Sequence, residues 1–485
     1  MNYKIVAKYL AYLVLVEAVF MLPSTAVGLI YGEYHAALCL LVTAGVCAVV
    51  GLALRLAGRG ARASFYAREG FVVAGLGWLM VSLLGALPFV ISGEIPNYFD
   101  AFFESASGFT TTGASVLANV EALSHAMLFW RSFTHWLGGI GVLAFILAVV
   151  RAGSSSGFGL HLLRAETPGP QVGKIAPKMR ESARLLLLVY GALSAVNLAL
   201  LLVGGMPLFD AFCTMFGTAG TGGFGIKNDS MASYSPYLQT VTTVFMALFG
   251  VNFALYYLVV RRQWRAALRD EELRLYVGIM LGAIALITIS VAASGQLPWG
   301  QSLHHSAFTV SSIMTTTGFA TVDFDLWPQF ARAIILLLMV IGAMAGSTGG
   351  GFKIARILIL FKSLRAGVHR LLHPHSVKTV RINGRTIDDE VLGRTYMYLL
   401  LYWVVILAVF TLLALQGLPI EENLSATLSC FNNIGPGLGL VGPTANYGIY
   451  SSAAKLLLTI TMLLGRLEIF PLLLLATPAT WRRKS

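Results

Sequence analysis

Four short segments of the chain combine glycine with small or hydroxyl-bearing residues, and each lies between two long apolar stretches. They read SASGFTTTGAS over 105–115, FGTAGTGGFG over 216–225, SSIMTTTGFAT over 311–321 and CFNNIGPGLGL over 430–440. Aligning them stacks Gly113, Gly222, Gly318 and Gly435. Four such loops meeting on one axis can form a ring of backbone carbonyl oxygens that replaces the water around a potassium ion.

The carbonyl oxygens expected to bind the ion belong to three consecutive residues of each loop. These residues are Thr111, Thr112, Gly113, Gly220, Thr221, Gly222, Thr316, Thr317, Gly318, Asn433, Ile434 and Gly435. Glycine is expected because such a ring requires backbone dihedrals that a Cβ atom would obstruct. A TTTG segment alone is a weak signal, and four unrelated turns are the alternative. Four matches at the same place in each repeat of the apolar pattern favour one shared ion site. The residues before the glycines differ between the loops, so the side chains around this site are not four-fold symmetric.

A further glycine-rich segment, AGSTGGGFK over 345–353, interrupts an apolar stretch beneath this predicted site. Its glycines disfavour a continuous helix by about 1 kcal/mol each relative to alanine. We expect a flexible gating loop that obstructs or opens the ion path, and a packing kink is the alternative. The gating residues are Gly346, Ser347, Thr348, Gly349, Gly350, Gly351 and Lys353. Phe352 separates the last glycine from the lysine and no strand precedes the loop, so the nucleotide-binding signature is not met.

Arg466 lies inside the apolar segment 456–471, where a charge is costly and by default marks a transport path. Pointing at the pore axis, it would repel a cation and act as an electrostatic barrier. The alternative is that it pairs with nearby Glu468 or reaches the membrane surface. Arg131 and Lys455 open their apolar stretches on the outer side, where ordinary interfacial placement explains them.

The composition identifies the elements that must position these residues. The chain has 485 residues, of which 57% are hydrophobic and 12% charged. Because a soluble domain carries about 25% charged residues, we expect a polytopic membrane protein. About ten apolar spans can be found, over 5–30, 35–57, 70–93, 125–150, 184–204, 236–260, 275–294, 330–361, 392–416 and 452–478. Cys39, Cys47, Cys213 and Cys430 have no metal-binding or disulfide pattern and are expected to be buried apolar residues.

The positive residues behind the net charge of +12 are concentrated in loops on one side of the predicted membrane spans. With ten spans and the N-terminus inside, the basic loops 55–69, 151–184, 261–274 and 362–391 and the C-terminal tail lie in the cytoplasm, and mainly acidic loops lie outside. We therefore expect both termini to be cytoplasmic and no nucleic acid to be bound. The first apolar run is long for a signal peptide and lacks a clear cleavage site, so it is predicted to be a retained helix.

Without the first two spans, the chain divides into four units of span, short re-entrant segment and span. The re-entrant segments are 97–109, 207–217, 300–314 and 420–431, and 99–102 and 209–212 share the sequence FDAF. Each segment can form a short helix whose C-terminal partial negative charge favours a cation at the membrane centre. The expected divisions are 1–69 for the two extra helices and 70–151, 152–262, 263–385 and 386–485 for the four pore repeats. The fold class predicted is therefore an all-α integral membrane protein.

These features resemble the Trk/Ktr/HKT superfamily of potassium transporters, and the two extra N-terminal spans resemble its Trk branch. The resemblance covers essentially the whole chain and is carried by FWRSFTHWLGG (129–139), the four loops, GSTGGGFK (346–353), NNIGPG (432–437) and Gly465-Arg466. It implies a homodimer with one pore per protomer, in the inner membrane of a bacterial cell and surrounded by membrane lipids. It also implies a cytoplasmic ring of nucleotide-binding RCK regulator subunits, for which the loops 151–184 and 362–391 are candidate docking surfaces.

The function expected is potassium uptake, with the ion as substrate and no cofactor in this chain. Plant relatives of the superfamily that carry serine at the first glycine look sodium-permeable, so four glycines imply potassium over sodium. A sodium or unselective monovalent-cation pathway remains open. A potassium symporter coupled to protons or sodium also remains open. It would need a titratable group at the membrane midplane, and His135, His304 and His305 are expected nearer the outer side. An enzyme is not expected, because no catalytic constellation is found.

Overall fold

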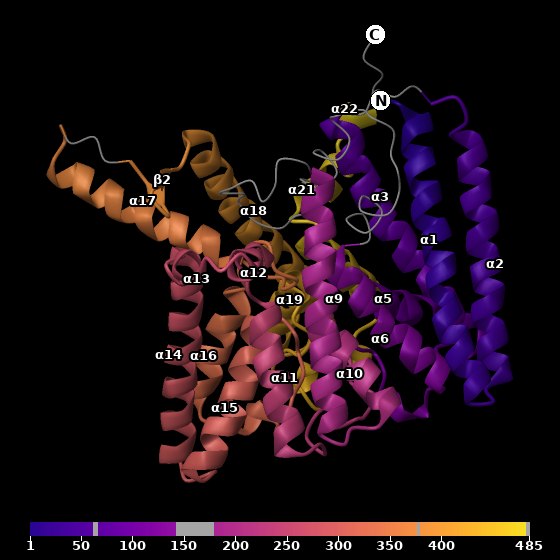
Figure 1. The fold of residues 1–485 in the computed structure, drawn as a ribbon, viewed down its shortest axis with the longest axis horizontal. Coiled ribbons are helices and arrows are strands. Elements are labelled where there is room, and N and C mark those ends of the chain that lie inside the picture. The colour runs from indigo at the N-terminus through magenta and orange to yellow at the C-terminus, as the bar shows by residue number, and fades with distance from the viewer. Residues whose placement is uncertain (62–65, 142–178, 376–378, 482–485) are drawn as a thin grey trace.

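The chain is helical almost throughout, as predicted. The computed structural model describes residues 1–61, 66–141, 179–375 and 379–481 (Figure 1). Within these ranges the strands are β1 (Arg381–Ile382) and β2 (Arg385–Thr386), which form one antiparallel hairpin. The four cysteines are buried and form no disulfide, as expected.

Two long helices form one side of the molecule. They are α1 (Tyr3–Ile30) and α2 (Tyr34–Ala57), which pack along each other and lie at the edge of the bundle in Figure 1. α1 also contacts α3 (Ala67–Gly85), which is followed by the short α4 (Leu87–Ile91). Of these helices, α3 and α4 contact the first re-entrant helix, α5 (Tyr98–Phe109).

Four short helices precede the four glycine loops. They are α5 (Tyr98–Phe109), α10 (Leu208–Gly220), α15 (Trp299–Met314) and α19 (Ile420–Asn432). The three long helices that precede the last three of them are α9 (Met179–Val203), α14 (Glu271–Ala293) and α18 (Asp389–Leu413). In the described part of the chain, six helices are long and apolar enough to cross a membrane.

The helix that follows each of the last three loops is interrupted, which differs from the expectation of a single break in the third unit. α11 (Pro236–Phe249) and α12 (Phe253–Val260) meet at a bend of 94°. α16 (Gln329–Val340) and α17 (Ile354–Leu372) are separated by the gating loop, and α20 (Ser452–Arg466) and α21 (Phe470–Ala476) by a short turn. Asn252 caps α12 through its side chain, and Glu468 and Ile469 adopt positive φ in the fourth break. In the first unit, α6 (His125–Ile140) ends at Gly141, and the rest of the predicted span lies outside the described residues.

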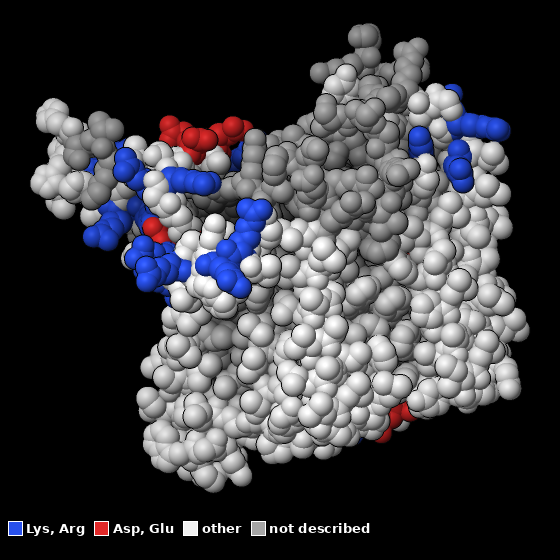
Figure 2. Space-filling view, viewed as in Figure 1, with Lys and Arg blue, Asp and Glu red and all other residues white. Residues whose placement is uncertain are grey.

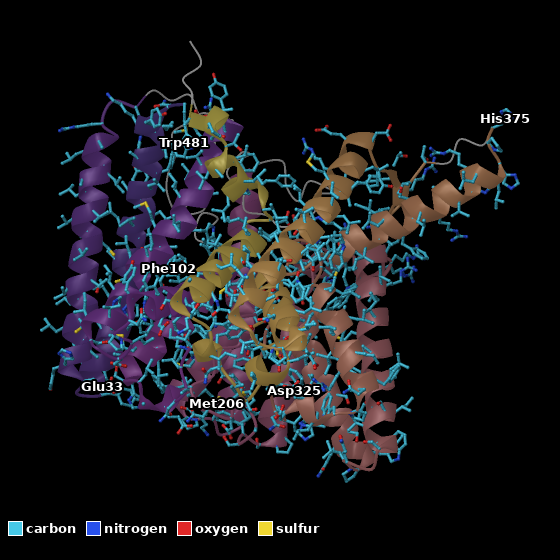
Figure 3. All side chains as sticks on the ribbon, turned by 180° about the vertical axis from the view of Figure 1, so that it is seen from behind. Glu33, Phe102, Met206, Asp325, His375 and Trp481 are labelled. Carbon is cyan, nitrogen blue, oxygen red and sulfur yellow. The ribbon has the colours of Figure 1, made fainter. Side chains whose placement is uncertain are left out.

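The two ends of the molecule differ in charge. Figure 3 places Glu33, Met206 and Asp325 at one end, and Trp481 and His375 at the opposite end, where both termini lie in Figure 1. Figure 2 shows Lys and Arg gathered at this terminal end, over α12, α13 (Trp264–Leu268) and α17 and near the N-terminus, while the flank of the bundle carries almost none. A flank with almost no charged side chains, below an end where charged side chains gather, fits a protein that spans a membrane.

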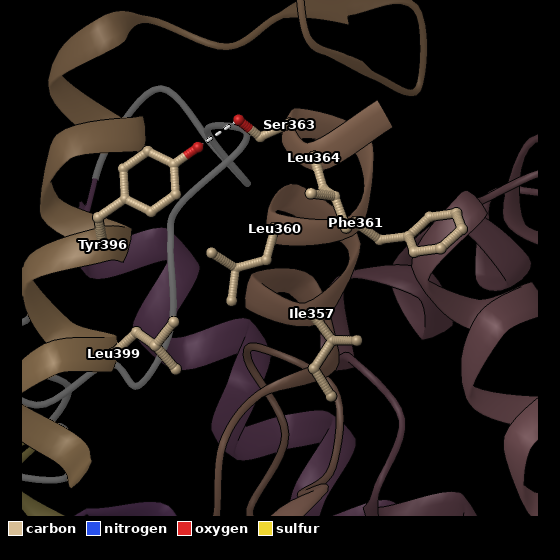
Figure 4. A pocket seen from close by; sticks show the side chains of 7 residues that line it. All are labelled: Ile357, Leu360, Phe361, Ser363, Leu364, Tyr396 and Leu399. Atoms are coloured by element: carbon tan, nitrogen blue, oxygen red, sulfur yellow. Dashed lines mark hydrogen bonds between the residues drawn. The ribbon is translucent and has the colours of Figure 1, made fainter. Parts of the chain in front are cut away.

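An apolar groove opens at the terminal end between α17 and α18. It has a volume of about 460 Å³ and is lined by Ile357, Leu360, Phe361, Ser363, Leu364, Tyr396 and Leu399 (Figure 4). The hydroxyl groups of Ser363 and Tyr396 hydrogen-bond to each other at its rim. From this groove α17 extends beyond the bundle, with Leu364, Leu371 and Leu372 at least two-thirds exposed.

Candidate ion-binding site

The four glycine loops share one unusual backbone conformation. At the end of each short helix one residue with a side chain adopts the left-handed conformation: Thr111 (φ 56°), Thr221 (54°), Thr316 (60°) and Asn433 (57°). Two residues later each loop has a glycine with positive φ: Gly113 (78°), Gly223 (71°), Gly318 (87°) and Gly435 (107°). Because positive φ is rare for residues with side chains, four occurrences at equivalent places show that the loops are built alike.

This comparison corrects the alignment of the second loop by one residue. The glycine equivalent to Gly113 is Gly223 and not Gly222. The amide of Gly222 donates to the carbonyl of Gly217 (2.9 Å), as the amide of Thr112 donates to that of Ser107 (2.8 Å). The shared FDAF segments are offset by 110 residues, and the same offset relates Gly113 to Gly223. The three equivalent residues of the second loop are therefore Thr221, Gly222 and Gly223, and Gly220 ends α10.

The loops contact one another in a closed cycle. A side chain at Gly113 would collide with the carbonyl oxygen of Gly222, and one at Gly223 with that of Thr317. Likewise a side chain at Gly318 would collide with the carbonyl oxygen of Ile434, and a Cβ at Gly435 would lie 2.9 Å from that of Thr112. Each loop thus presses a glycine against the backbone of the next, and the fourth returns to the first. The carbonyl oxygens involved belong to the middle residue of each loop.

Most hydroxyl groups in the loops are hydrogen-bonded within the protein. The hydroxyls of Thr110 and Thr112 lie 2.7 Å apart, and those of Thr315 and Thr317 lie 2.8 Å apart. The Asn433 amide donates to the hydroxyl of Thr112 (2.9 Å) and so joins the fourth loop to the first. These side chains position the loops, which leaves backbone carbonyls as the groups suited to a cation.

The fourth loop differs at its glycine. The carbonyl oxygen of Gly435 accepts hydrogen bonds from the hydroxyls of Ser429 (2.7 Å) and Tyr447 (2.9 Å). A carbonyl oxygen has two lone pairs, so both are engaged by the protein. Gly435 was predicted as an ion ligand, and in this geometry its carbonyl is already occupied. Sequence reasoning did not find Tyr447, which lies in a short turn beyond the loop.

Two ion pairs, one buried and one partly exposed, brace the loops at the end opposite the termini. Arg131 of α6 donates to Glu104 of α5 (2.6 Å), with both side chains at most 2% exposed, and also to the carbonyl of Gly225 (2.9 Å). Glu104 in turn accepts from the amide of Val116 (3.0 Å), so the pair joins the first and second loops. Lys455 pairs with Asp100 (2.7 Å). The expectation of ordinary interfacial placement for Arg131 and Lys455 is therefore wrong.

His135 packs between the first short helix and the second loop. Its Nδ1 donates to the carbonyl of Gly108 (2.8 Å), and its Nε2 accepts from the amide of Phe224 (3.2 Å). Only a neutral imidazole can donate at one nitrogen and accept at the other. The ring also leaves no room for a side chain at Gly222, which explains that glycine separately from the loop pattern.

The gating loop, residues 341–353, lies directly against the four-loop site. The amide of Gly350 donates to the Thr316 hydroxyl (2.6 Å). A Cβ at Gly349 would lie 2.8 Å from the carbonyl oxygen of Thr315, and one at Gly350 would collide with that of Asn432. The loop is also closed on itself, because Gly342 donates to Phe352 (3.0 Å) and Phe352 to Val340 (3.3 Å). The predicted flexible segment is thus a bonded loop placed under the third and fourth ion-site loops.

Arg466 joins the gating loop to the first unit. Its guanidinium donates to the carbonyl of Thr348 (3.0 Å), to the hydroxyl of Thr111 (3.3 Å) and to the carbonyl of Gly138. The alternative that Arg466 pairs with Glu468 is not seen, since Glu468 pairs with Arg356 (2.6 Å). Lys353 is buried and donates to the carbonyl of Gly349 in its own loop. The predicted gating residues are therefore gathered beneath the predicted ion ligands.

Comparison with known proteins identifies the family. A family model described as the cation transport protein TrkH matches residues 41–483. The Trk system potassium uptake protein TrkH of Salmonella typhimurium is 34% identical over 99% of this chain and its own full length. The chain belongs to the TrkH family.

Further relatives agree with this family. The Trk system potassium uptake protein TrkG of Escherichia coli is 32% identical over 99% of both chains. The crystal structure of the potassium transporter TrkH from Vibrio parahaemolyticus superposes with a TM-score of 0.88 at 30% identity, and covers 99% of this chain and 100% of that one. The resemblance noted in the sequence is thus confirmed. The chain is a multi-pass membrane protein of a transporter family and not an enzyme.

No metal site of the usual kind accompanies the ion site. Among the described residues, no group of three or more His, Cys, Asp or Glu side chains could hold a metal ion. Potassium is a large, weakly hydrated ion that carbonyl oxygens can bind.

Proposed function

We propose that this chain conducts potassium into the cell through the ring formed by its four glycine loops. The closed cycle of contacts between the loops supports this proposal best. In this cycle the backbone carbonyls of Thr112, Gly222, Thr317 and Ile434 each lie against the glycine of a neighbouring loop. Four equivalent carbonyls around one axis can replace the hydration shell of potassium. The relatives named as potassium uptake proteins support the choice of ion.

The ion sites in this proposal are the predicted ones with two changes. Gly223 takes the place of Gly220 in the second loop, and the carbonyl of Gly435 contributes less than the other three glycines. The four pore repeats surround this path, and α1 and α2 lie outside it. Movement down the electrochemical gradient is the simplest case, and at 100 mV the membrane potential contributes about 2.3 kcal/mol per charge to it.

The gate in this proposal is the loop 341–353 together with Arg466. The loop lies against the carbonyls at the inner side of the third and fourth ion-site loops. Arg466 hydrogen-bonds to both the gating loop and Thr111, so its positive charge lies between the loop and the first ion-site loop. Flux would then require the loop to move and the guanidinium to leave the ion path.

The proposed setting is the inner membrane of a bacterial cell, with the terminal end in the cytoplasm. The gathering of Lys and Arg at that end supports this orientation (Figure 2). A homodimer is proposed, and the apolar groove of Figure 4 with the exposed side chains of α17 is the surface available for pairing. Membrane lipids would cover the rest of the flank.

An RCK regulator ring that binds nucleotide is the proposed cytoplasmic partner. The names of the relatives describe them as parts of a Trk system, which is compatible with such a partner. Of the two docking loops suggested by sequence, 151–184 lies almost entirely outside the described residues. The other, 362–391, contains the end of α17 and the β-hairpin.

Reconstitution into liposomes tests the proposed function. Uptake of K⁺ and Rb⁺ into liposomes with purified protein should exceed uptake into empty liposomes, and Na⁺ uptake should be much lower. Equal uptake of the three ions would support the unselective pathway. A reversal potential that shifts with pH would instead support proton coupling, which the neutral, fully bonded His135 does not favour.

A further inference from the structure

A single carboxylate bonds to the backbone on both sides of the glycine-rich segment Gly346–Gly351 of the gating loop. Glu272 lies in the first turn of α14, and its Oε1 accepts from the amide of Ala345 (2.7 Å) and from the amide of Ala355 (3.1 Å). Ala345 precedes the glycine-rich part of the loop and Ala355 follows it. The Glu272 residue is buried, with 9% of its surface exposed. The two ends of the loop are therefore joined through a side chain that belongs to a different helix.

The chemistry of these two bonds suits a carboxylate. Ala355 is in the first turn of α17, where backbone amides have no partner within the helix. A negative charge at a helix N-terminus is stabilised by the helix dipole and by these amides. The other side chains that hold the loop from outside, Thr316 and Arg466, contact its middle. Glu272 alone among the described hydrogen bonds reaches both of its flanks.

The same turn of α14 is bonded to the surface at the terminal end. Asp270, which caps α14, accepts from the Asn383 amide (2.6 Å), and the amide of Glu271 donates to the Asn383 side chain (2.9 Å). Asn383 lies in the turn of the β1–β2 hairpin. Glu271 pairs with Lys362 of α17, which also donates to the carbonyl of Arg381 in the hairpin (2.7 Å).

These contacts form one continuous path from an exposed hairpin to the gating loop. The hairpin turn bonds to residues 270–271, and residue 272 bonds to both flanks of the loop. A displacement of the hairpin would move the first turn of α14, and hydrogen bonds weaken steeply when their geometry is lost. The charged groups that face Glu272 are Lys353 of the loop and Asp270 of its own helix.

We infer that Glu272 is a positioning residue that keeps the gating loop in the ion path, and that the hairpin 381–386 is where a cytoplasmic protein partner acts on it. The inference rests on the proposed function of the loop as a gate. A partner that binds the hairpin would release the loop by pulling the first turn of α14 away from it. The hairpin carries Arg381 and Arg385, so the contacting face of the partner is acidic.

Substitution of Glu272 tests this inference. Glu272→Leu removes the acceptor at similar size, and Glu272→Gln keeps an amide oxygen that can accept from both amides. Basal Rb⁺ uptake of Glu272→Leu in liposomes should rise about tenfold, the factor that 1.4 kcal/mol produces, and Glu272→Gln should stay near the parent. The ratio of Rb⁺ to Na⁺ uptake should be unchanged in both. A rise in the leucine variant alone would show that the two hydrogen bonds of Glu272 restrain the gating loop. A general defect in folding would instead lower uptake.

A second variant keeps the test decisive if Glu272→Leu does not fold. Asn383→Asp retains a residue that tolerates the turn conformation and places a carboxylate opposite Asp270. Basal Rb⁺ uptake should rise in this exposed variant too, by less than for Glu272→Leu. Parent-level uptake in a folded Glu272→Leu and in Asn383→Asp, or a changed ion ratio, would overturn the inference. Absence of uptake by the parent protein would instead count against the proposed function.

Discussion

The four ion-site loops and the gating loop are both rich in glycine and touch each other, yet they are held in different ways. The ion-site loops press backbone against backbone in a closed cycle and are braced by the buried pair of Arg131 and Glu104. The gating loop is held from outside by separate hydrogen bonds. Two join backbone to backbone, from Met344 to Gly250 and from Phe253 to Gly346. The others involve the side chains of Thr316, Arg466 and Glu272.

This difference indicates which of the two kinds of loop can move. Displacing one ion-site loop would break contacts with both of its neighbours, because the cycle has no free end. Displacing the gating loop requires separate hydrogen bonds to break, both backbone bonds to the break between α11 and α12 and side-chain bonds, but it does not open a closed cycle. A site that selects ions by carbonyl geometry needs the first kind of support, and a gate needs the second.

The largest effect should come from adding a side chain within the cycle. Gly223→Ala would place a Cβ against the carbonyl of Thr317 at a φ of 71°, which costs about 1–2 kcal/mol before any collision. We expect Rb⁺ uptake to fall sharply and its excess over Na⁺ uptake to disappear. Gly295→Ala is the matched control, since Gly295 has a similar φ of 72° and nothing within 4 Å of its Cβ position. Parent-level uptake by Gly223→Ala would show that the second loop is not in the cycle.

The brace behind the loops should have the next largest effect. Arg131→Met leaves the Glu104 carboxylate buried without its partner, and removing one member of a buried pair costs about 3–5 kcal/mol. Thermal unfolding in detergent should show a large loss of stability. Arg394→Ala removes an exposed pair with Glu390 and should change stability by less than about 1 kcal/mol. Equal losses in the two variants would contradict the role given to the brace.

Removing the arginine at the gate should have a smaller effect, and on rate alone. Arg466→Ala removes a positive charge from the ion path, and basal Rb⁺ uptake should rise about tenfold, equivalent to about 1.4 kcal/mol in the barrier. The ratio of Rb⁺ to Na⁺ uptake should not change. A variant that loses selectivity without gaining rate would place Arg466 in the ion-site region instead of the gate.

The smallest effect should be a change in pH dependence at the end opposite the termini. Burial, together with nearby Asp323, raises the pKa of Asp325 to about 6, and Asp325 accepts from the amide of Gly439 after the fourth loop. The folded protein then binds a proton that the unfolded chain releases, so this group's contribution to stability falls as pH rises from about 4 to 6. Unfolding temperatures of Asp325→Asn should vary less across that interval, and an unchanged slope would exclude this role.

Much of this arrangement could be predicted from the sequence, because it depends on local patterns. The four short helices end within three residues of their predicted limits, since apolar runs too short for a membrane and glycine-rich loops mark them. The placement of Gly346 to Gly351 beneath the ion site follows from its position in the third unit. Arg466 was singled out because a charge in an apolar run is rare.

The rest depends on contacts between distant residues. The second loop is an exception, because the FDAF offset in the sequence already relates Gly113 to Gly223, and the backbone dihedrals agree with it. The Gly222 position is explained by His135, 87 residues earlier in the chain. Arg131 and Lys455 looked interfacial because their partners, Glu104 and Asp100, lie on another helix. Tyr447 carries no local signal that it would reach Gly435.

The most direct test of the ring is the ratio of potassium to sodium permeability in liposomes for Gly113→Ser. Its side chain would meet the carbonyl of Gly222, so the ratio should fall toward one while the protein stays folded. Gly295→Ser, with the same substitution at a turn outside the ring, should keep the ratio of the parent. A parent-like ratio in a folded, conducting Gly113→Ser would contradict the conclusion that the four loops select the ion together.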